Sequence, residues 1–318
     1  MARKKSTIGI IGLGPMGSIL AAHLAKHGED VVVEDIVEEL LIIIKEKGLD
    51  ISGIRKLTTK IDRTCKSISE LSNFNPDIIF IATKACILKV ILPEIKKIYS
   101  PEMKLVSFQN GLGNEQFINE MLGIDTSYRV VINYAGNNIG LGKAQMNWFQ
   151  PPNFVGSFSK GKYTVDGTTK YIAATMTASG LMTEETPDIK RHVWKKTILN
   201  SALCSICAIT GETMKEAMEL KHSRTLAMDI LGEGLAVAKA DGYDFGLGAL
   251  KQFTSYLEKG GNHKPSMLID VENKRPTEVD FMSGAISFYG EKYGIATPVN
   301  STFTKLLKTI ETRYSKPS

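Results

Sequence analysis

The chain has 318 residues, of which 43% are hydrophobic, a length and composition that predict a two-domain protein with a sizeable buried interior. Its net charge of +5 comes from 39 basic and 34 acidic residues spread along the chain, without the dense basic tract of a nucleic-acid-binding protein. No apolar run reaches the roughly eighteen residues of a membrane span, and no signal peptide is recognised. We expect a cytoplasmic protein that binds neither nucleic acid nor membrane.

The four cysteines, at positions 65, 86, 204 and 207, are too few and too scattered for a disulfide framework. Cys204 and Cys207 have the C-x-x-C spacing of redox and zinc motifs. They lie in a helical pattern without a second cysteine or histidine pair, so we interpret them as packing residues and expect no metal site.

The first motif follows an apolar strand pattern at residues 8–11 and precedes a helical pattern. Gly12 permits a sharp turn, Gly14 leaves no side chain between the backbone and a pyrophosphate, and Gly17 lets helix and strand pack closely. The helix N-terminus then offers N–H groups to the anion. A dinucleotide site is therefore predicted at Gly12, Leu13, Gly14, Pro15, Met16 and Gly17.

The second apolar strand, Val31 to Val33, ends in Glu34 and Asp35, about twenty residues beyond the glycines. A carboxylate here accepts hydrogen bonds from the adenosine ribose and repels a 2′-phosphate. Asp35 therefore favours NAD over NADP. Lys84 follows the strand at residues 77–82 and is a second candidate for contact with the cofactor, at a phosphate or ribose.

Strand and helix patterns alternate through the first half, which predicts a doubly wound parallel sheet. The strand at residues 104–108 delivers Asn110 to a carboxyl end, where ligands bind, so Asn110 is a candidate cofactor-binding residue that would face the nicotinamide end, although an Asn-Gly turn alone would explain the residue. Between residues 128 and 183 we expect antiparallel strands at the sheet edge. From residue 187 onward five helical patterns follow, at residues 189–210, 213–241, 247–259, 275–294 and 299–314. The predicted domains are residues 1–186, which bind the dinucleotide, and 187–318, a helical substrate domain.

Two segments of the helical half carry a family resemblance. Trp194, Lys196 and Asn200 form a W-x-K-x-x-x-N pattern, and residues 266–280 resemble an S-M-x-x-D-x-x-x-x-R-x-T-E-x-D signature. Both resemble segments of the ketopantoate reductases (2-dehydropantoate 2-reductases). With the glycine turn, residues 82–84 and residues 109–111, the landmarks run in order from residue 8 to residue 300. The resemblance implies an α/β fold, with an N-terminal Rossmann-type sheet and a helical C-terminal domain like that of 6-phosphogluconate dehydrogenase.

The resemblance also implies NAD(P)H-dependent reduction of a 2-oxo acid to a 2-hydroxy acid, most directly 2-dehydropantoate to pantoate in pantothenate and coenzyme A biosynthesis. Lys196 would be the general acid, and Glu278 would hold the lysine or a substrate hydroxyl from across a cleft. Asn110 and Asn200 would orient the substrate, and Ser266 would bind its carboxylate or hydroxyl. The structural alternatives are a solvated helix face for Lys196, an exposed helix start for Glu278 and a helix cap for Ser266.

Two departures from the family leave the substrate open. Cys204 stands where the family usually has a second asparagine, and residues 142–153 replace a more polar hairpin. The alternatives are a dehydrogenase for another 2-oxo acid, an opine-type dehydrogenase, or a sensor that binds the dinucleotide without turnover. A homodimer is the assembly that we consider.

Overall fold

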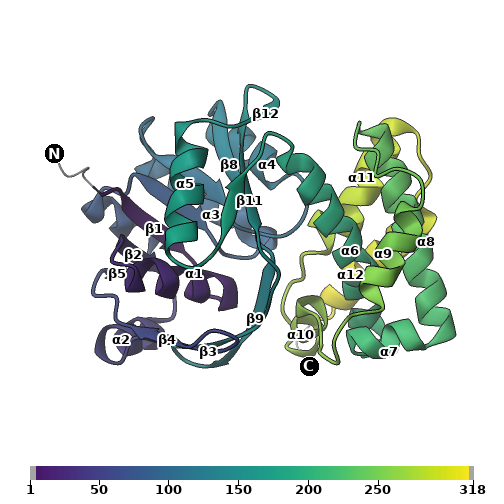
Figure 1. Cartoon of the computed structure of the whole chain (residues 1–318), viewed down its shortest axis with the longest axis horizontal. Coiled ribbons are helices and arrows are strands. Elements are labelled where there is room, and N and C mark those ends of the chain that lie inside the picture. The colour runs from purple at the N-terminus through teal and green to yellow at the C-terminus, as the bar shows by residue number, and fades with distance from the viewer. Residues whose placement is uncertain (1–4, 315–318) are drawn as a thin grey trace. The chain divides into compact units, whose positions relative to one another are not determined.

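The computed structural model describes residues 5–314, which divide into two compact units. Among the described residues, the first comprises 5–109 and 114–189, and the second comprises 110–113 and 190–314. The first unit is built around a mostly parallel sheet and the second is helical, which confirms the predicted fold class (Figure 1). The assignment of separate roles to residues 1–186 and 187–318 remains a proposal.

Within residues 5–189, nine strands form the large sheet. From edge to edge they are β12 (Lys162–Thr164), β11 (Asn153–Ser159), β8 (Thr126–Val131), β7 (Lys104–Ser107), β6 (Ile78–Ile81), β1 (Thr7–Ile11), β2 (Asp30–Glu34) and β5 (Thr64–Cys65), with β13 (Thr183–Glu185) also on β11. The six strands from β8 to β5 run parallel. All four residues of β6 are buried, as expected for a sheet covered on both faces.

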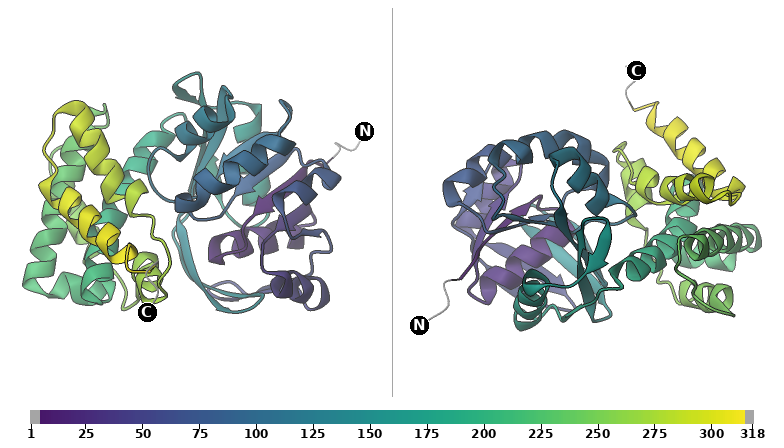
Figure 2. Two further views of the ribbon diagram at one scale, coloured as in Figure 1. Left: turned by 180° about the vertical axis from the view of Figure 1, so that it is seen from behind. Right: turned by 90° about the horizontal axis from the view of Figure 1, so that it is seen from above.

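Helices cover both faces of this sheet (Figure 2). One face carries α1 (Pro15–Lys26) and α5 (Gly167–Ala178), which contact each other, and the other carries α3 (Leu88–Ile98) and α4 (Asn114–Leu122). The remaining helical elements of this unit are α2 (Glu38–Glu46) and the 3-10 turns η1 (Ile68–Phe74) and η2 (Ala85–Ile87). This arrangement brings the loops after β1, β2 and β6 to one edge of the sheet, where the glycine turn lies.

The expectation of antiparallel edge strands between residues 128 and 183 is only partly right. β11 pairs antiparallel with β8, and β12 with β11, as expected. β9 (Tyr134–Gly140) and β10 (Lys143–Phe149) instead join β3 (Leu49–Gly53) and β4 (Leu57–Thr59) in a second sheet, in the order β4-β3-β10-β9. Buried Ala144 and Met146 belong to the same apolar core as α1, which explains why this hairpin packs there.

The second unit contains helices throughout, and none of its described residues forms a strand. Its elements are α6 (Ile189–Thr210), α7 (Met214–Glu219), α8 (Lys221–Ala240), α9 (Ala249–Leu257), α10 (Ser266–Glu272), the 3-10 turn η3 (Val279–Phe281), α11 (Ser283–Tyr293) and α12 (Pro298–Glu311). α6 has the predicted bounds. No helix in the described part of the chain is both long and apolar enough to cross a bilayer.

Two helix predictions need correction, and one helix is additional to those predicted. The pattern at residues 213–241 forms two helices, because Leu220 between them is extended. The pattern at residues 275–294 becomes helical only at Ser283, since residues 274–278 are irregular and Pro276 lacks a backbone donor. α10, at residues 266–272, was not predicted, because seven residues are too short for a clear periodic pattern.

Candidate functional site

The glycine turn has the geometry that its sequence predicts. Gly12 has φ +90°, and a Cβ there would lie 2.6 Å from Thr83 Cγ2. A Cβ at Gly17 would lie 2.0 Å from the carbonyl oxygen of Gly12, so helix and strand meet at backbone distance. A Cβ at Gly14, by contrast, would have no atom within 4 Å. The turn is therefore closed at Gly12 and Gly17 and open at Gly14, the position expected to approach a pyrophosphate.

The start of α1 continues this turn. Gly14 is its N-cap residue, and within residues 5–314 no side chain caps the helix there. Pro15 occupies the first turn, which contains no acidic residue. An N-terminus of this kind attracts an anion through its N–H groups and the positive end of the helix dipole. These features fit a dinucleotide pyrophosphate.

Asp35 contacts the glycine turn directly. Its Oδ2 accepts a hydrogen bond of 2.8 Å from the Leu13 backbone N–H, and its Oδ1 accepts one of 3.0 Å from Val37 N–H. The carboxylate is therefore held at the end of β2 and beside the turn. The remaining lone pairs of the two Asp35 carboxylate oxygens can accept hydrogen bonds from ribose hydroxyls.

Sequence reasoning did not include Glu34, the residue before Asp35. Its side chain is buried, and this burial, with the charges of Asp35 and Glu70, raises the pKa of its carboxyl to about 7. The sequence carried a signal for this burial, because Glu34 continues the apolar run Val31 to Val33, and an uninterrupted apolar run is typical of a strand covered on both faces. Two carboxyl groups thus stand at the end of β2.

Lys84 and Asn110 are both half-buried, but they group with different units. Lys84 directly precedes η2 in the first unit. Asn110 begins the segment Asn110–Gly113, which packs with the second unit. Leu112 N–H donates a hydrogen bond of 2.8 Å to the carbonyl oxygen of Phe281 in η3, and Gly111 approaches the same residue. Sequence reasoning assigned Asn110 to the first domain because these contacts are distant along the chain.

Lys196, Asn200 and Cys204 succeed one another by one turn along α6. Lys196 and Asn200 are half-buried and Cys204 is buried, whereas Lys195 is exposed. The three therefore share one helix face, and this face becomes more buried from Lys196 toward Cys204. Lys195 therefore lies on a solvated helix face. Lys196 does not, so the structural alternative stated for Lys196 does not apply.

Charged groups converge on the Cys204 thiol. Burial raises the pKa of this thiol most, the neighbouring thiol Cys207 and the charges of Glu278 and Asp270 raise it further, and the charge of Lys196 lowers it. One buried sulfur therefore lies within electrostatic reach of an ammonium and two carboxylates. Lys196 and Glu278, predicted from segments 82 residues apart, are brought together in one unit.

Glu278 is 7% exposed, so it is not the exposed helix-start carboxylate of the structural alternative. It lies at the N-cap of η3, and its neighbour Val279 packs in the same apolar cluster as Cys204. Met267 belongs to this cluster as well, which ties the start of α10 to α6. Asp270 is buried on α10, and its Oδ1 lies 3.3 Å from a guanidinium nitrogen of Arg275.

Ser266 is exposed at the first position of α10. The N-cap residue of that helix is Pro265, and no side-chain hydrogen bond caps it within the described residues, so the helix-cap alternative does not describe Ser266. The role of Ser266 in substrate binding stays a prediction. Cys204 and Cys207 are free thiols in the interior, in agreement with their interpretation as packing residues.

Comparison with known proteins covers most of the chain. Residues 8–157 match the family model of ketopantoate reductase PanE/ApbA, and residues 188–311 match that of its C-terminal domain. A 2-dehydropantoate 2-reductase from Archaeoglobus fulgidus is 29% identical over 307 residues, which are 95% of this chain and 97% of the relative.

Solved structures agree in fold over nearly the whole length. A 2-dehydropantoate 2-reductase from Geobacter metallireducens has a TM-score of 0.86 at 25% identity, over 95% of this chain and 99% of the other. A D-mandelate dehydrogenase solved with NADH and anilino(oxo)acetate has a TM-score of 0.82 at 25% identity, over 98% and 100% of the two chains. The chain therefore belongs to the ketopantoate reductase family, whose members are oxidoreductases acting on CH–OH groups.

Proposed function

We propose that this protein reduces a 2-oxo acid to the 2-hydroxy acid with a nicotinamide dinucleotide, and that its substrate is 2-dehydropantoate, which gives pantoate. The observation that supports this most is the convergence of Lys196 and Glu278 on the same buried thiol. A carbonyl reductase needs a proton donor held in a partly desolvated place, and Lys196 is half-buried and shares with Glu278 an electrostatic effect on the same buried thiol. Family membership and the names of the relatives support the same reaction. Pantoate would then serve pantothenate and coenzyme A biosynthesis.

The cofactor would be held by the glycine turn, Gly12 to Gly17, and by the N-terminus of α1. Asp35 would accept hydrogen bonds from the ribose hydroxyls, and Lys84 would approach a phosphate or ribose. NADH is preferred over NADPH in this proposal, because a 2′-phosphate would meet the carboxylate of Asp35, which lies at the end of β2 beside the glycine turn. When bound, the nicotinamide ring supplies the hydride.

The protein's own residues carry the remaining chemistry. Lys196 donates a hydrogen bond to the keto oxygen, which polarises the carbonyl, and it gives up its proton as the alkoxide forms. Glu278 holds the ammonium or a substrate hydroxyl. Asn200, one turn along α6, and Asn110 orient the substrate, and Ser266 binds its carboxylate or hydroxyl.

A direct assay tests the proposal. Reduction of 2-dehydropantoate is followed by the absorbance of NADH and, separately, of NADPH. We expect turnover with a higher kcat/KM for NADH. Tight NADH binding without oxidation, over a screen of 2-oxo acids with and without amines, would instead identify a dinucleotide-binding sensor, and oxidation only when an amine is present would identify an opine-type dehydrogenase.

A second candidate is reduction of a less polar 2-oxo acid. Cys204 is a weak hydrogen-bonding group on which the charges of Lys196 and Glu278 act, and it belongs to an apolar cluster with Met267, Val279 and Met282. The likeness to a D-mandelate dehydrogenase is in keeping with such a substrate. A higher kcat/KM for an aromatic 2-oxo acid such as phenylglyoxylate than for 2-dehydropantoate would favour this candidate.

The assembly proposed is a homodimer. Light scattering coupled to size exclusion measures the mass in solution directly, and the mass of one chain is 34.9 kDa.

A further inference from the structure

The segment that carries Glu278 has no regular structure of its own. Residues 274–278 are irregular, and η3 after them has three residues. Such a segment cannot fix the orientation of a carboxylate by an internal hydrogen-bond ladder. The position of the backbone around Glu278 therefore depends on contacts from another element.

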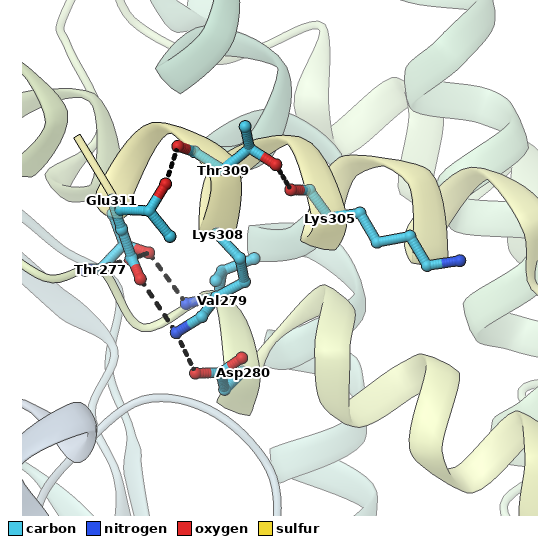
Figure 3. A network of polar contacts seen from close by, with 8 residues as sticks. Thr277, Val279, Asp280, Lys305, Lys308, Thr309 and Glu311 are labelled. Atoms are coloured by element: carbon cyan, nitrogen blue, oxygen red, sulfur yellow. Dashed lines mark hydrogen bonds and ion pairs between the residues drawn. The ribbon is translucent and has the colours of Figure 1, made fainter.

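Contacts to the residues on either side of Glu278 come from the last helix, α12 (Figure 3). Glu311 Oε1 accepts two hydrogen bonds from Thr277, one of 2.8 Å from its backbone N–H and one of 2.5 Å from its hydroxyl. Thr277 Oγ1 in turn accepts a hydrogen bond of 3.3 Å from Val279 N–H. Thr277 is thus joined directly to one carboxylate on α12, and Val279 is joined to it through the Thr277 hydroxyl.

Lys308, one turn before Glu311, completes the network. Its Nζ lies 2.9 Å from Asp280 Oδ2 and 2.9 Å from Glu311 Oε2. Burial acts to lower the pKa of Lys308, but its hydrogen bonds with Asp280 and Glu311 outweigh this effect, so the pKa is raised and the ammonium is retained. The ammonium therefore connects Asp280, beyond Glu278, to the same carboxylate.

The Thr277–Glu311 part of the network is protected from water, whereas the Lys308 and Asp280 side chains are about half exposed. Thr277 is 2% exposed, and the Glu311 side chain is 13% exposed. Beneath it, Leu307 of α12 packs in the apolar cluster that contains Val279 and Cys204. Charge-assisted hydrogen bonds at such a site are stronger than exposed ones, so the network can fix a backbone position.

We propose that Glu311 is a positioning residue for the reaction: it holds the backbone of residues 277–280 so that the Glu278 carboxylate stays directed at the Lys196 side of the site. The inference rests on the proposed role of Glu278. It follows because a small misplacement of a group that acts on the proton donor lowers turnover steeply, whereas binding of the dinucleotide involves other residues.

The test combines two variants of Glu311 with one of Glu278. Glu311→Ala removes both acceptor oxygens and should lower kcat about ten-fold with the KM for NADH changed less than about two-fold. Glu311→Gln keeps an oxygen for Thr277 and should recover most of kcat. Lys305→Ala, on the same helix but with its side chain directed away from the network in Figure 3, is the matched control and should leave kcat unchanged.

A double-mutant cycle separates positioning from general destabilisation. If Glu311 acts through Glu278, Glu311→Ala should lower kcat less than about two-fold further once Glu278→Gln is present. An equal loss in both backgrounds, or no loss in either, would overturn the proposal.

Hydrogen exchange distinguishes a failure of the Glu311 proposal from a failure of the proposed function. If the wild-type protein reduces no 2-oxo acid, the reaction assignment fails, and exchange at the amides of Thr277 and Val279 still reads the contact with α12. Glu311→Ala should speed exchange at these two amides more than exchange at core amides that report global unfolding. Unaltered exchange would show that Glu311 does not hold the segment.

Discussion

The backbone N–H of Leu112 donates a hydrogen bond of 2.8 Å to the carbonyl oxygen of Phe281. This bond joins the segment that begins at Asn110 to η3, the turn that directly follows Glu278. Both proposed substrate-site segments are therefore held by the same short turn within the second unit.

This contact requires that residue 111 carry no side chain, a condition that Gly111 meets. It has φ +92°, and a Cβ there would lie 2.5 Å from both the Cβ and the carbonyl oxygen of Phe281. Gly111→Ala should lower the free energy of unfolding by about 2–4 kcal/mol and lower kcat, because the backbone must move. Gly113→Ala is the control: its φ is +83° but its Cβ would meet no atom within 4 Å, so a cost of about 1 kcal/mol is expected. Equal losses in the two variants, measured by urea unfolding, would argue against the contact.

Replacement of Asp35 tests the basis of cofactor preference. Asp35→Asn keeps an acceptor for Leu13 N–H but removes the charge that repels a 2′-phosphate, so the ratio of kcat/KM for NADH to that for NADPH should fall about ten-fold. Asp30→Asn, at the opposite end of β2 and paired with Arg63, should leave the ratio unchanged. A preference that survives in Asp35→Asn would assign the selection to other residues.

Glu34 gives a pH dependence of stability with a definite sign. Its pKa is about 7 in the folded protein against the ordinary value of 4.5, so the folded state binds its proton more tightly than the unfolded state. The contribution of protonated Glu34 is fully present below about pH 4.5 and is lost as the pH rises through 7. Glu34→Gln should therefore raise Tm at about pH 8.5 by more than at about pH 5. An equal change in Tm at the two pH values would contradict the assignment.

Cys204 tests which 2-oxo acid the site accepts. Cys204→Asn returns the polar group that the family pattern has there, so kcat/KM for 2-dehydropantoate should rise relative to that for phenylglyoxylate. The amide is buried, and a stability loss of about 1–3 kcal/mol is expected with it. Cys207→Ser, another buried thiol of α6, is the control and should leave the substrate ratio unchanged. An unchanged ratio in Cys204→Asn would remove Cys204 from substrate selection.

Local patterns in the sequence predicted the features that depend on near neighbours. The glycine turn needs only a strand, three glycines and a helix start within about twenty residues, and the bounds of α6 are those of one long helical pattern in the sequence. Lys196 and Asn200 share a face because they are four residues apart.

Features that join distant segments could not be predicted in this way. Thr277 and Glu311 are 34 residues apart, and Leu112 and Phe281 lie still farther apart along the chain. The pairing of β10 with β3 depends on which apolar surface the hairpin covers, and strand periodicity alone does not decide this. The irregular segment at residues 274–278 likewise depends on its partners in α12 rather than on its own propensity.

The central claim is that Lys196 supplies the proton to the reduced carbonyl, and its substitution tests the claim most directly. Lys196→Ala is compared with Lys195→Ala, which removes the exposed neighbouring ammonium from the same helix. We expect Lys196→Ala to lower kcat for 2-oxo acid reduction by about 10²- to 10⁴-fold with the Kd for NADH nearly unchanged, and Lys195→Ala to change neither value. A Lys196→Ala protein that turns over at the wild-type rate would contradict the account.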